Sequence, residues 1–336
     1  MKKPKWRKDT LGRYAWMFLI LISITACKKT SYDLADPATA GVWALLNTSS
    51  GLPANQIRDI KRDTQNNLWI AFSGNGVGMY RNGGWTYYNT SNSSILSNSV
   101  TSLGPTLDGG IIIGTLNGIS IRSSSGAWSS YKDPNVTTMV INTIKVASDG
   151  SRWLGTEGEG FYVNYGSGYS QIYASAFANV NAIEEDDLGD IFVGTDNGLL
   201  EWNGSKFTLY TTSNGLPSNN ITSLFSDSKK RLWIGTNGGP TVCWLESSSG
   251  YITQLSLLNS DAGSFVRSIY EDKRGHIWFA TWFDGLVEYD NVMPITYKKY
   301  TGFYEDNVNC IGDDVDGNLW IGLYSKGLAE YTLPLK

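Results

Sequence analysis

The sequence predicts an all-β protein: a seven-bladed β-propeller with four-stranded antiparallel blades, its ring closed by an N-terminal strand in the last blade. A large apolar residue recurs along the 336-residue chain at intervals of 39 to 45 residues, a second apolar column precedes it by twelve residues, and the last repeat lacks one strand. The first column is Trp69, Ile112, Trp153, Phe192, Trp233, Trp278 and Trp320. Aligned columns repeated seven times are typical of a radial repeat array.

Each repeat indicates four short strands separated by turn residues. The preceding column opens the first strand and consists of Ile57, Val100, Ile141, Val180, Ile221, Val266 and Val308. An Asp-x-x-Gly turn often follows, as at residues 272–275, and leads to the second strand with its Trp-type residue. A turn containing glycine then leads to the third strand, and an aromatic-ended fourth strand follows. A single blade cannot bury both of its faces, so the repeats are expected to stack against one another.

The seventh repeat ends near Tyr331 and has no fourth strand of its own. Residues 42–46 (Val-Trp-Ala-Leu-Leu) precede the first repeat and resemble a fourth strand in their position before a Gly-Leu-Pro segment. We expect this strand to complete the last blade, because an open ring would leave an unpaired sheet edge.

The N-terminus has the character of a targeting segment. A basic stretch up to Arg13 precedes an apolar run at residues 15–22, and the sequence then reads Ile-Thr-Ala-Cys at 24–27. This resembles a bacterial lipobox, which implies a signal peptide over residues 1–26, lipidation of Cys27, a tether over 27–39 and a propeller over 40–336. Lys28, rather than Asp, follows the cysteine, which favours the outer membrane in that resemblance. An ordinary signal peptide or an anchor helix is the alternative.

The net charge limits the classes of partner that this protein can bind. The chain carries −4 and residues 1–26 contribute +5, so the remainder carries −9. An acidic body argues against nucleic acid, because neutralising phosphates requires a basic patch. The two other cysteines, Cys243 and Cys310, fall two blades apart and are interpreted as buried thiols.

Several motifs resemble the two-component regulator propeller repeat. They are Gly-Leu-Pro-Ala-Asn-Gln-Ile at residues 51–57, Asn-Gly-Leu-Pro-Ser-Asn-Asn-Ile at 214–221 and Leu-Trp-Ile-Gly-Thr at 232–236. In that family, tandem propellers often form the extracytoplasmic sensor half of regulators that detect glycan fragments. This sequence departs from the pattern, since we expect one propeller, no kinase and no DNA-binding region.

Aromatic residues that interrupt a repeat column are candidates for ligand binding. Four residues after the Trp-type position, the turn between the second and third strands carries Trp282 and Tyr324 in the last two repeats, where the other repeats carry Ser, Leu, Glu, Asp or Asn. Phe283 follows Trp282, and Tyr304 lies on the loop between the same blades. We predict one aromatic face beside the channel mouth, a surface on which sugars stack. The alternative is a loop cluster whose rings pack only on one another.

A polar column directly follows the first aliphatic residue of each repeat. Its members are Arg58, Thr101, Asn142, Asn181, Thr222, Arg267 and Asn309. Because the first strand of a blade lines the channel, these residues are expected to form a hydrogen-bonding ring there. Arg58 and Arg267 suit a carboxylate or sulfate held through two parallel hydrogen bonds. The alternative is a water-filled channel that needs only a polar lining.

Catalytic and metal motifs are sparse. His276 is the only histidine and falls on a turn away from the predicted mouth. A zinc site needs several His or Cys ligands, and one histidine with two separated cysteines cannot supply them. The oxygen-rich turn at residues 314–318 (Asp-Val-Asp-Gly-Asn) leaves calcium as a possible cofactor, although its glycine comes too early for an EF-hand. No nucleophile motif and no phosphate-binding loop is present in the sequence.

These observations favour a non-catalytic, ligand-binding propeller of the cell envelope. The expected partners are a glycan or peptide ligand, envelope proteins, and the membrane through the lipid anchor. Two alternatives remain open: a scaffold for envelope proteins, and a polysaccharide or glycoside lyase on a propeller scaffold.

Overall fold

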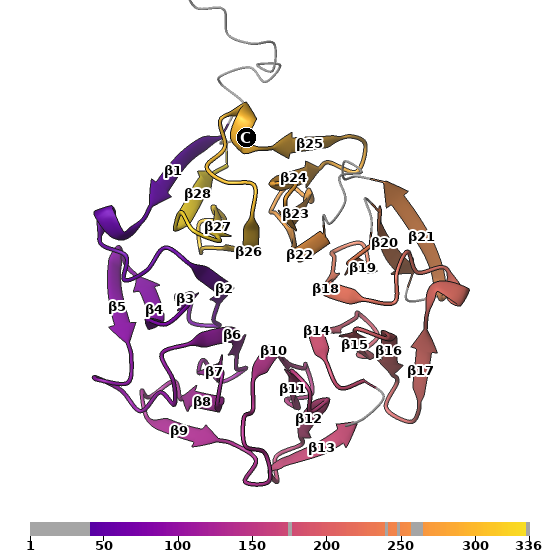
Figure 1. Cartoon of the computed structure of the whole chain (residues 1–336), viewed down its shortest axis with the longest axis horizontal. Coiled ribbons are helices and arrows are strands. Elements are labelled where there is room, and N and C mark those ends of the chain that lie inside the picture. Colours follow the sequence, from indigo (N-terminus) through magenta and orange to yellow (C-terminus); the bar gives the residue numbers. More distant parts are fainter. Residues whose placement is uncertain (1–40, 174–176, 239–240, 247–248, 257–264, 334–336) are drawn as a thin grey trace, which may run out of the picture. The chain divides into compact units, whose positions relative to one another are not determined.

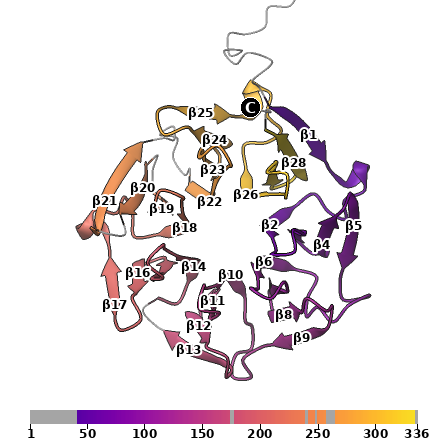
Figure 2. The same ribbon diagram turned by 180° about the vertical axis from the view of Figure 1, so that it is seen from behind.

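Seven four-stranded antiparallel sheets are arranged in a ring, as Figure 1 and the reverse view in Figure 2 show. The structure is a computed structural model and describes residues 41–173, 177–238, 241–246, 249–256 and 265–333. The propeller itself is the unit Gly41–Leu333. The predicted fold class and the number of blades are confirmed.

The blades follow one another in chain order, and each contains an innermost, two middle and an outermost strand. Blades 1 to 3 are β2 (Ile57–Arg62), β3 (Leu68–Phe72), β4 (Gly76–Arg81) and β5 (Gly84–Tyr88); β6 (Val100–Pro105), β7 (Ile111–Thr115), β8 (Gly118–Arg122) and β9 (Trp128–Tyr131); and β10 (Ile141–Val146), β11 (Arg152–Thr156), β12 (Phe161–Asn164) and β13 (Tyr169–Tyr173).

Blades 4 to 6 are β14 (Val180–Glu185), β15 (Ile191–Thr195), β16 (Gly198–Trp202) and β17 (Phe207–Tyr210); β18 (Ile221–Ser226), β19 (Arg231–Thr236), β20 (Thr241–Glu246) and β21 (Tyr251–Ser256); and β22 (Phe265–Glu271), β23 (Ile277–Trp282), β24 (Leu286–Tyr289) and β25 (Pro294–Tyr297). Blade 7 combines β26 (Val308–Asp313), β27 (Leu319–Leu323) and β28 (Leu328–Thr332) with β1 (Val42–Leu46). Three short 3-10 turns, Thr48–Ser50, Thr212–Asn214 and Lys299–Thr301, lead from outer strands toward the next blade.

The ring closes as predicted, through β1. This strand pairs antiparallel with β28, in a register that runs from Val42 opposite Thr332 to Leu46 opposite Leu328. Trp43 stacks on Tyr331 with ring centroids 4.4 Å apart and meets Phe303 edge-on at 5.2 Å. The closing strand therefore contributes an aromatic ring to the packing of blade 7 as well as backbone hydrogen bonds.

The recurring tryptophans are core residues tied to the turn before them. In four blades the indole N–H donates to the turn aspartate six residues earlier, at 2.7 to 3.0 Å. The pairs are Trp69 with Asp63, Trp233 with Asp227, Trp278 with Asp272, and Trp320 with Asp314. In blade 3, where Ala147 replaces the aspartate, Trp153 donates to Ser151 instead. A buried indole N–H requires such an acceptor, which explains the two linked columns.

Neighbouring blades approach closely behind these tryptophans. A β-carbon added to Gly155 would lie 2.5 Å from Val180 of the next blade, and one added to Gly194 would lie 2.6 Å from Ile221. The small residue two positions after each Trp-type residue therefore makes room for the first strand of the following blade. The buried clusters accordingly mix residues of adjacent blades, as where Trp278 packs with Val308 and Ile311.

The signal peptide, Cys27 and the tether lie outside the described residues. In the part of the chain that the structure describes, no helix is long and apolar enough to cross a membrane. Cys243 and Cys310 are both free and buried, as expected.

Candidate ligand-binding site

A cavity of about 640 Å³ runs along the central channel and is lined mainly by the first strands of the blades. All seven residues of the predicted polar ring line it: Arg58, Thr101, Asn142, Asn181, Thr222, Arg267 and Asn309. The expectation that this column faces the channel is therefore met in every blade.

A β-bulge places each ring residue. In all seven blades the register between the first and second strands shifts across this position, for example between Ile141 and Thr143. A bulge adds an unpaired residue, bends the strand and re-aims the side chain. The polar column in the sequence therefore marks a β-bulge that recurs in all seven blades.

Five of the seven ring side chains bond to the neighbouring blade. Each donates to the backbone carbonyl of the first aliphatic residue of an adjacent first strand. The pairs are Thr101 with Ile141, Asn142 with Val180, Asn181 with Ile221, Thr222 with Val266, and Asn309 with Ile57. We call these bonds the ring latch. They satisfy carbonyls beside the bulges, so a structural role accounts for the asparagines and threonines.

Arg58 and Arg267 are the two ring residues outside the latch. Arg58 is exposed to the channel. Arg267 is half-buried, with its guanidinium 5.2 Å from the ring centroid of Trp282 and 5.8 Å from that of Phe265. Burial, and secondarily the charge of Arg58, lower the pKa of Arg267 below its ordinary value. Two cations therefore share one side of the mouth.

The predicted aromatic face centres on Trp282. Its ring meets Tyr324 edge-on at 4.9 Å and Phe283 at 5.7 Å, and it stacks against Phe265 at 6.2 Å. Trp282 is the last residue of β23, rather than a turn residue, and is half-buried among these rings. Phe283 is 52% exposed and Tyr324 39% exposed, so they form the outward part of the face. Trp282 therefore packs among neighbouring rings while Phe283 and Tyr324 remain accessible, and ligand binding on this face stays a prediction.

Tyr304 contacts a different group of rings from Trp282, Phe283 and Tyr324. Its ring contacts Phe303 at 5.5 Å and packs against the buried cluster between blades 6 and 7. Burial raises the pKa of its phenol. It replaces the proline of the Gly-Leu-Pro segment, so its position in the repeat accounts for its packing.

Two residues at the mouth were absent from the sequence prediction. Phe265 interrupts a column of mostly polar residues directly before the first aliphatic residue, a signal of the kind that identified Trp282. Asp196 lines the cavity and accepts hydrogen bonds from Asn181 at 2.8 Å and Asn179 at 2.7 Å. The Asp196 carboxylate is therefore already satisfied by two side-chain amides.

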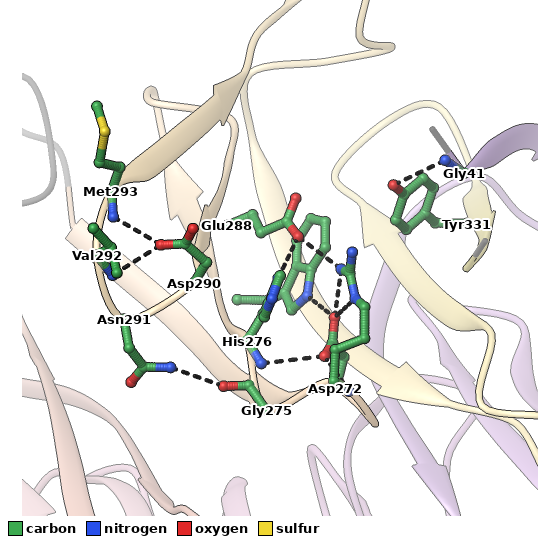
Figure 3. A network of polar contacts seen from close by, with 12 residues as sticks. Gly41, Asp272, Gly275, His276, Glu288, Asp290, Asn291, Val292, Met293 and Tyr331 are labelled. Carbon is green, nitrogen blue, oxygen red and sulfur yellow. Dashed lines mark hydrogen bonds and ion pairs between the residues drawn. The ribbon is translucent and has the colours of Figure 1, made fainter. Parts of the chain in front are cut away.

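His276 belongs to a separate polar network on the turn side of blade 6, which Figure 3 shows. Its Nδ1 lies 2.8 Å from Glu288, and its backbone N–H donates to Asp272. The Arg274 guanidinium donates to both of these carboxylates at 2.6 Å. Although burial opposes it, hydrogen bonding to Arg274 and Trp278 lowers the pKa of Asp272.

The network around His276 also contains residues that could bind a metal ion. Among the described residues, Asp272, His276 and Glu288 bring three potential ligand atoms together. Arg274 already places its positive charge between the two carboxylates, which disfavours a cation there. At the turn proposed for calcium, Asp314 accepts hydrogen bonds from Asp316, Asn318 and the Trp320 indole. Its carboxylate is thus used to shape the turn.

The repeats of this chain match a known protein family. Residues 51–74, 215–238 and 260–283 match the family model described as Two component regulator propeller. The chain carries two component regulator propeller repeats. The matched segments include the first and second strands of blades 1, 5 and 6. No curated protein matches the sequence.

Solved structures share the fold of this chain at low sequence identity. The extracellular domain of BT4673 from B. thetaiotaomicron, named as a one component system, is 20% identical with a TM-score of 0.69 over 88% of this chain and 40% of that chain. BT3049 from the same organism, named as a hybrid two component system, is 18% identical with a TM-score of 0.70 over 87% and 42%. This chain therefore spans less than half of those extracellular domains.

A third match is similar in length to this chain. The catalytically inactive virginiamycin B lyase from Staphylococcus aureus with Quinupristin is 16% identical, with a TM-score of 0.72 over 87% of this chain and 99% of that chain. Identities in this range establish a common propeller architecture and leave the ligand to the site itself.

Proposed function

We propose that this chain is a non-catalytic, ligand-binding propeller of the bacterial cell envelope that recognises a glycan or glycan fragment, as a sensor-like or accessory protein. The observation that carries the proposal is the accessible pair Phe283 and Tyr324, held by Trp282 beside the channel cavity. Exposed rings at a concave polar mouth combine an apolar surface for a sugar face with donors and acceptors for its hydroxyls.

The location is also a proposal. The lipobox resemblance at Cys27 supports an outer-membrane lipoprotein, and the BT4673 and BT3049 domains that share the fold are extracellular. A lipid anchor with the ligand site on the propeller would leave the mouth accessible to envelope glycans.

Binding by calorimetry to a panel of neutral and acidic oligosaccharides and peptides tests the function. Tyr324→Ala should weaken binding of the best oligosaccharide about tenfold, because a central aromatic contact commonly contributes more than 1 kcal/mol. Tyr251→Ala is the matched control, since this tyrosine is 69% exposed but lies on β21 at the rim of blade 5. Failure of every oligosaccharide to bind, or equal binding by wild type and Tyr324→Ala, would overturn the proposal.

The lyase alternative derives support from the fold shared with virginiamycin B lyase. Against it, His276 is the only histidine and is engaged with Glu288 outside the cavity lining. Incubation with uronate polysaccharides, monitored by the absorbance of unsaturated products, separates the two functions. Sustained product formation by wild type would establish the lyase.

The scaffold alternative rests on an exposed apolar run at the outer edge of blade 6. Val292, Met293 and Ile295 are each more than half exposed, on β25 and the turn before it. If this rim holds an envelope protein, Met293→Asp should abolish a co-purifying partner that Tyr324→Ala retains. Loss of that partner with Tyr324→Ala instead would assign the contact to the mouth.

A further inference from the structure

The two ring arginines are exceptions to a rule that the other five positions obey. Thr101, Asn142, Asn181, Thr222 and Asn309 each bond to a neighbouring blade. Across the described residues, Arg58 and Arg267 have no hydrogen-bond or ion-pair partner, and they line the cavity. The ring latch therefore explains five polar residues and does not include these two cations.

The arginines flank a single blade. Arg58 lies on β2 and Arg267 on β22, and both strands pack against β26 of blade 7, which carries Asn309. The Asn309 amide nitrogen donates to the Ile57 carbonyl at 2.7 Å, which fixes the orientation of the side chain. Its Oδ1 is buried, lacks a hydrogen-bond partner and belongs to a residue that lines the cavity.

The geometry points to a ligand that carries a carboxylate or sulfate group next to a hydroxyl, an acidic saccharide, with its anionic group on Arg58 and Arg267 and its hydroxyl on Asn309. This inference rests on the proposed function and names the class of glycan. Two guanidinium groups that repel one another across one site are stabilised by an anion between them. A buried carbonyl oxygen without a donor gains most from a ligand hydroxyl.

The aromatic face and this anion site are continuous. Trp282 and Phe265 hold the Arg267 guanidinium by cation–π contacts, so one donor is positioned before the ligand arrives. Tyr324 joins the cluster through its edge contact with Trp282. A sugar ring on the accessible aromatic residues can therefore present an acidic substituent toward the arginines.

The test compares matched ligands that differ in the acidic group. Galacturonate oligosaccharides and their methyl esters isolate the carboxylate, and chondroitin disaccharides with and without a sulfate ester isolate the sulfate. The purified full chain should bind one acidic member of a pair about tenfold more tightly than its neutral counterpart, and the preference should shrink as salt rises.

Variants assign the preference to residues. Arg58→Gln and Arg267→Gln should each reduce the preference for the acidic ligand to less than about threefold. The exposed Arg81→Gln, at the end of β4, is the control and should leave it unchanged. Because Arg58 packs against no ring, its variant tests the anion site even if Arg267→Gln disturbs Trp282.

The outcomes separate this inference from the proposed function. Equal binding of acidic and neutral oligosaccharides that still depends on Tyr324 would overturn the anion site and keep the glycan. Unchanged preference in Arg58→Gln and Arg267→Gln would likewise overturn the assignment to the arginines. If inorganic sulfate binds and none of the saccharides binds, both the acidic-saccharide inference and the proposed function are overturned.

Discussion

Phe283 offers a way to remove a binding surface without weakening the fold. Its φ angle is +77°, a left-handed conformation that a bulky side chain rarely adopts. Three other blades place a glycine with positive φ at the same position of the turn, namely Gly74, Gly158 and Gly238. The Phe283 N–H donates to Asn307 at 3.0 Å, and Gly158 makes the corresponding bond to Asn179. The turn is therefore held by the same device whether phenylalanine or glycine occupies it.

Two effects of similar size and opposite sign determine how Phe283→Asn changes the free energy of unfolding. Asparagine tolerates the left-handed region, so the change releases about 1–2 kcal/mol of backbone strain. It also removes the edge contact of the ring with Trp282, which at 5.7 Å contributes about 0.5–1.5 kcal/mol. The free energy of unfolding should therefore change by less than about 1 kcal/mol, and the melting temperature by less than about 4 °C.

Binding should respond differently from stability. If Phe283 contacts the ligand, loss of a half-exposed ring at the mouth should raise the dissociation constant about fivefold to tenfold. Calorimetric binding and thermal unfolding of the same preparation provide the two measurements, with Phe283→Gly as a second variant of the same backbone preference. A fall of more than 4 °C together with unchanged affinity would show that the ring serves packing alone and refute the reasoning.

Four further expectations concern the latch, the closure, pH and the anchor. Asn181→Ala should lower the free energy of unfolding by about 1–3 kcal/mol in urea titrations, since it leaves the Ile221 carbonyl without its donor, whereas Arg58→Ala should change it little. Trp43→Ala should destabilise the ring by about 3 kcal/mol, and an unchanged urea midpoint would show that closure does not depend on this ring. The pKa of Asp272 is lowered in the folded state, so its contribution is complete above pH about 4 and disappears at lower pH; the stability gap between wild type and Asp272→Asn should narrow below that pH. Cys27→Ala should abolish palmitate labelling and release the protein from the membrane fraction, and labelling that persists would exclude this cysteine.

The sequence by itself determined the architecture and where the channel lining would fall. Periodic columns report local structure faithfully, because every blade repeats the same strands and turns, and four blades repeat the buried Trp–Asp pair. The missing strand of the last repeat and the spare strand at residues 42–46 were sufficient to predict closure, since an unpaired sheet edge is costly.

Tertiary structure decided what the polar and aromatic residues of the mouth do. The column that contains Asn181 and Arg267 is uniformly polar in sequence and lies at a bulge in every blade, but only the structure shows which of its side chains bond to the next blade. Trp282 interrupts its column, yet its burial depends on Phe265 and Tyr324, which lie 17 and 42 positions away along the chain. Contacts across the strands of one blade and between neighbouring blades set these roles, and a repeat column shows neither kind of contact.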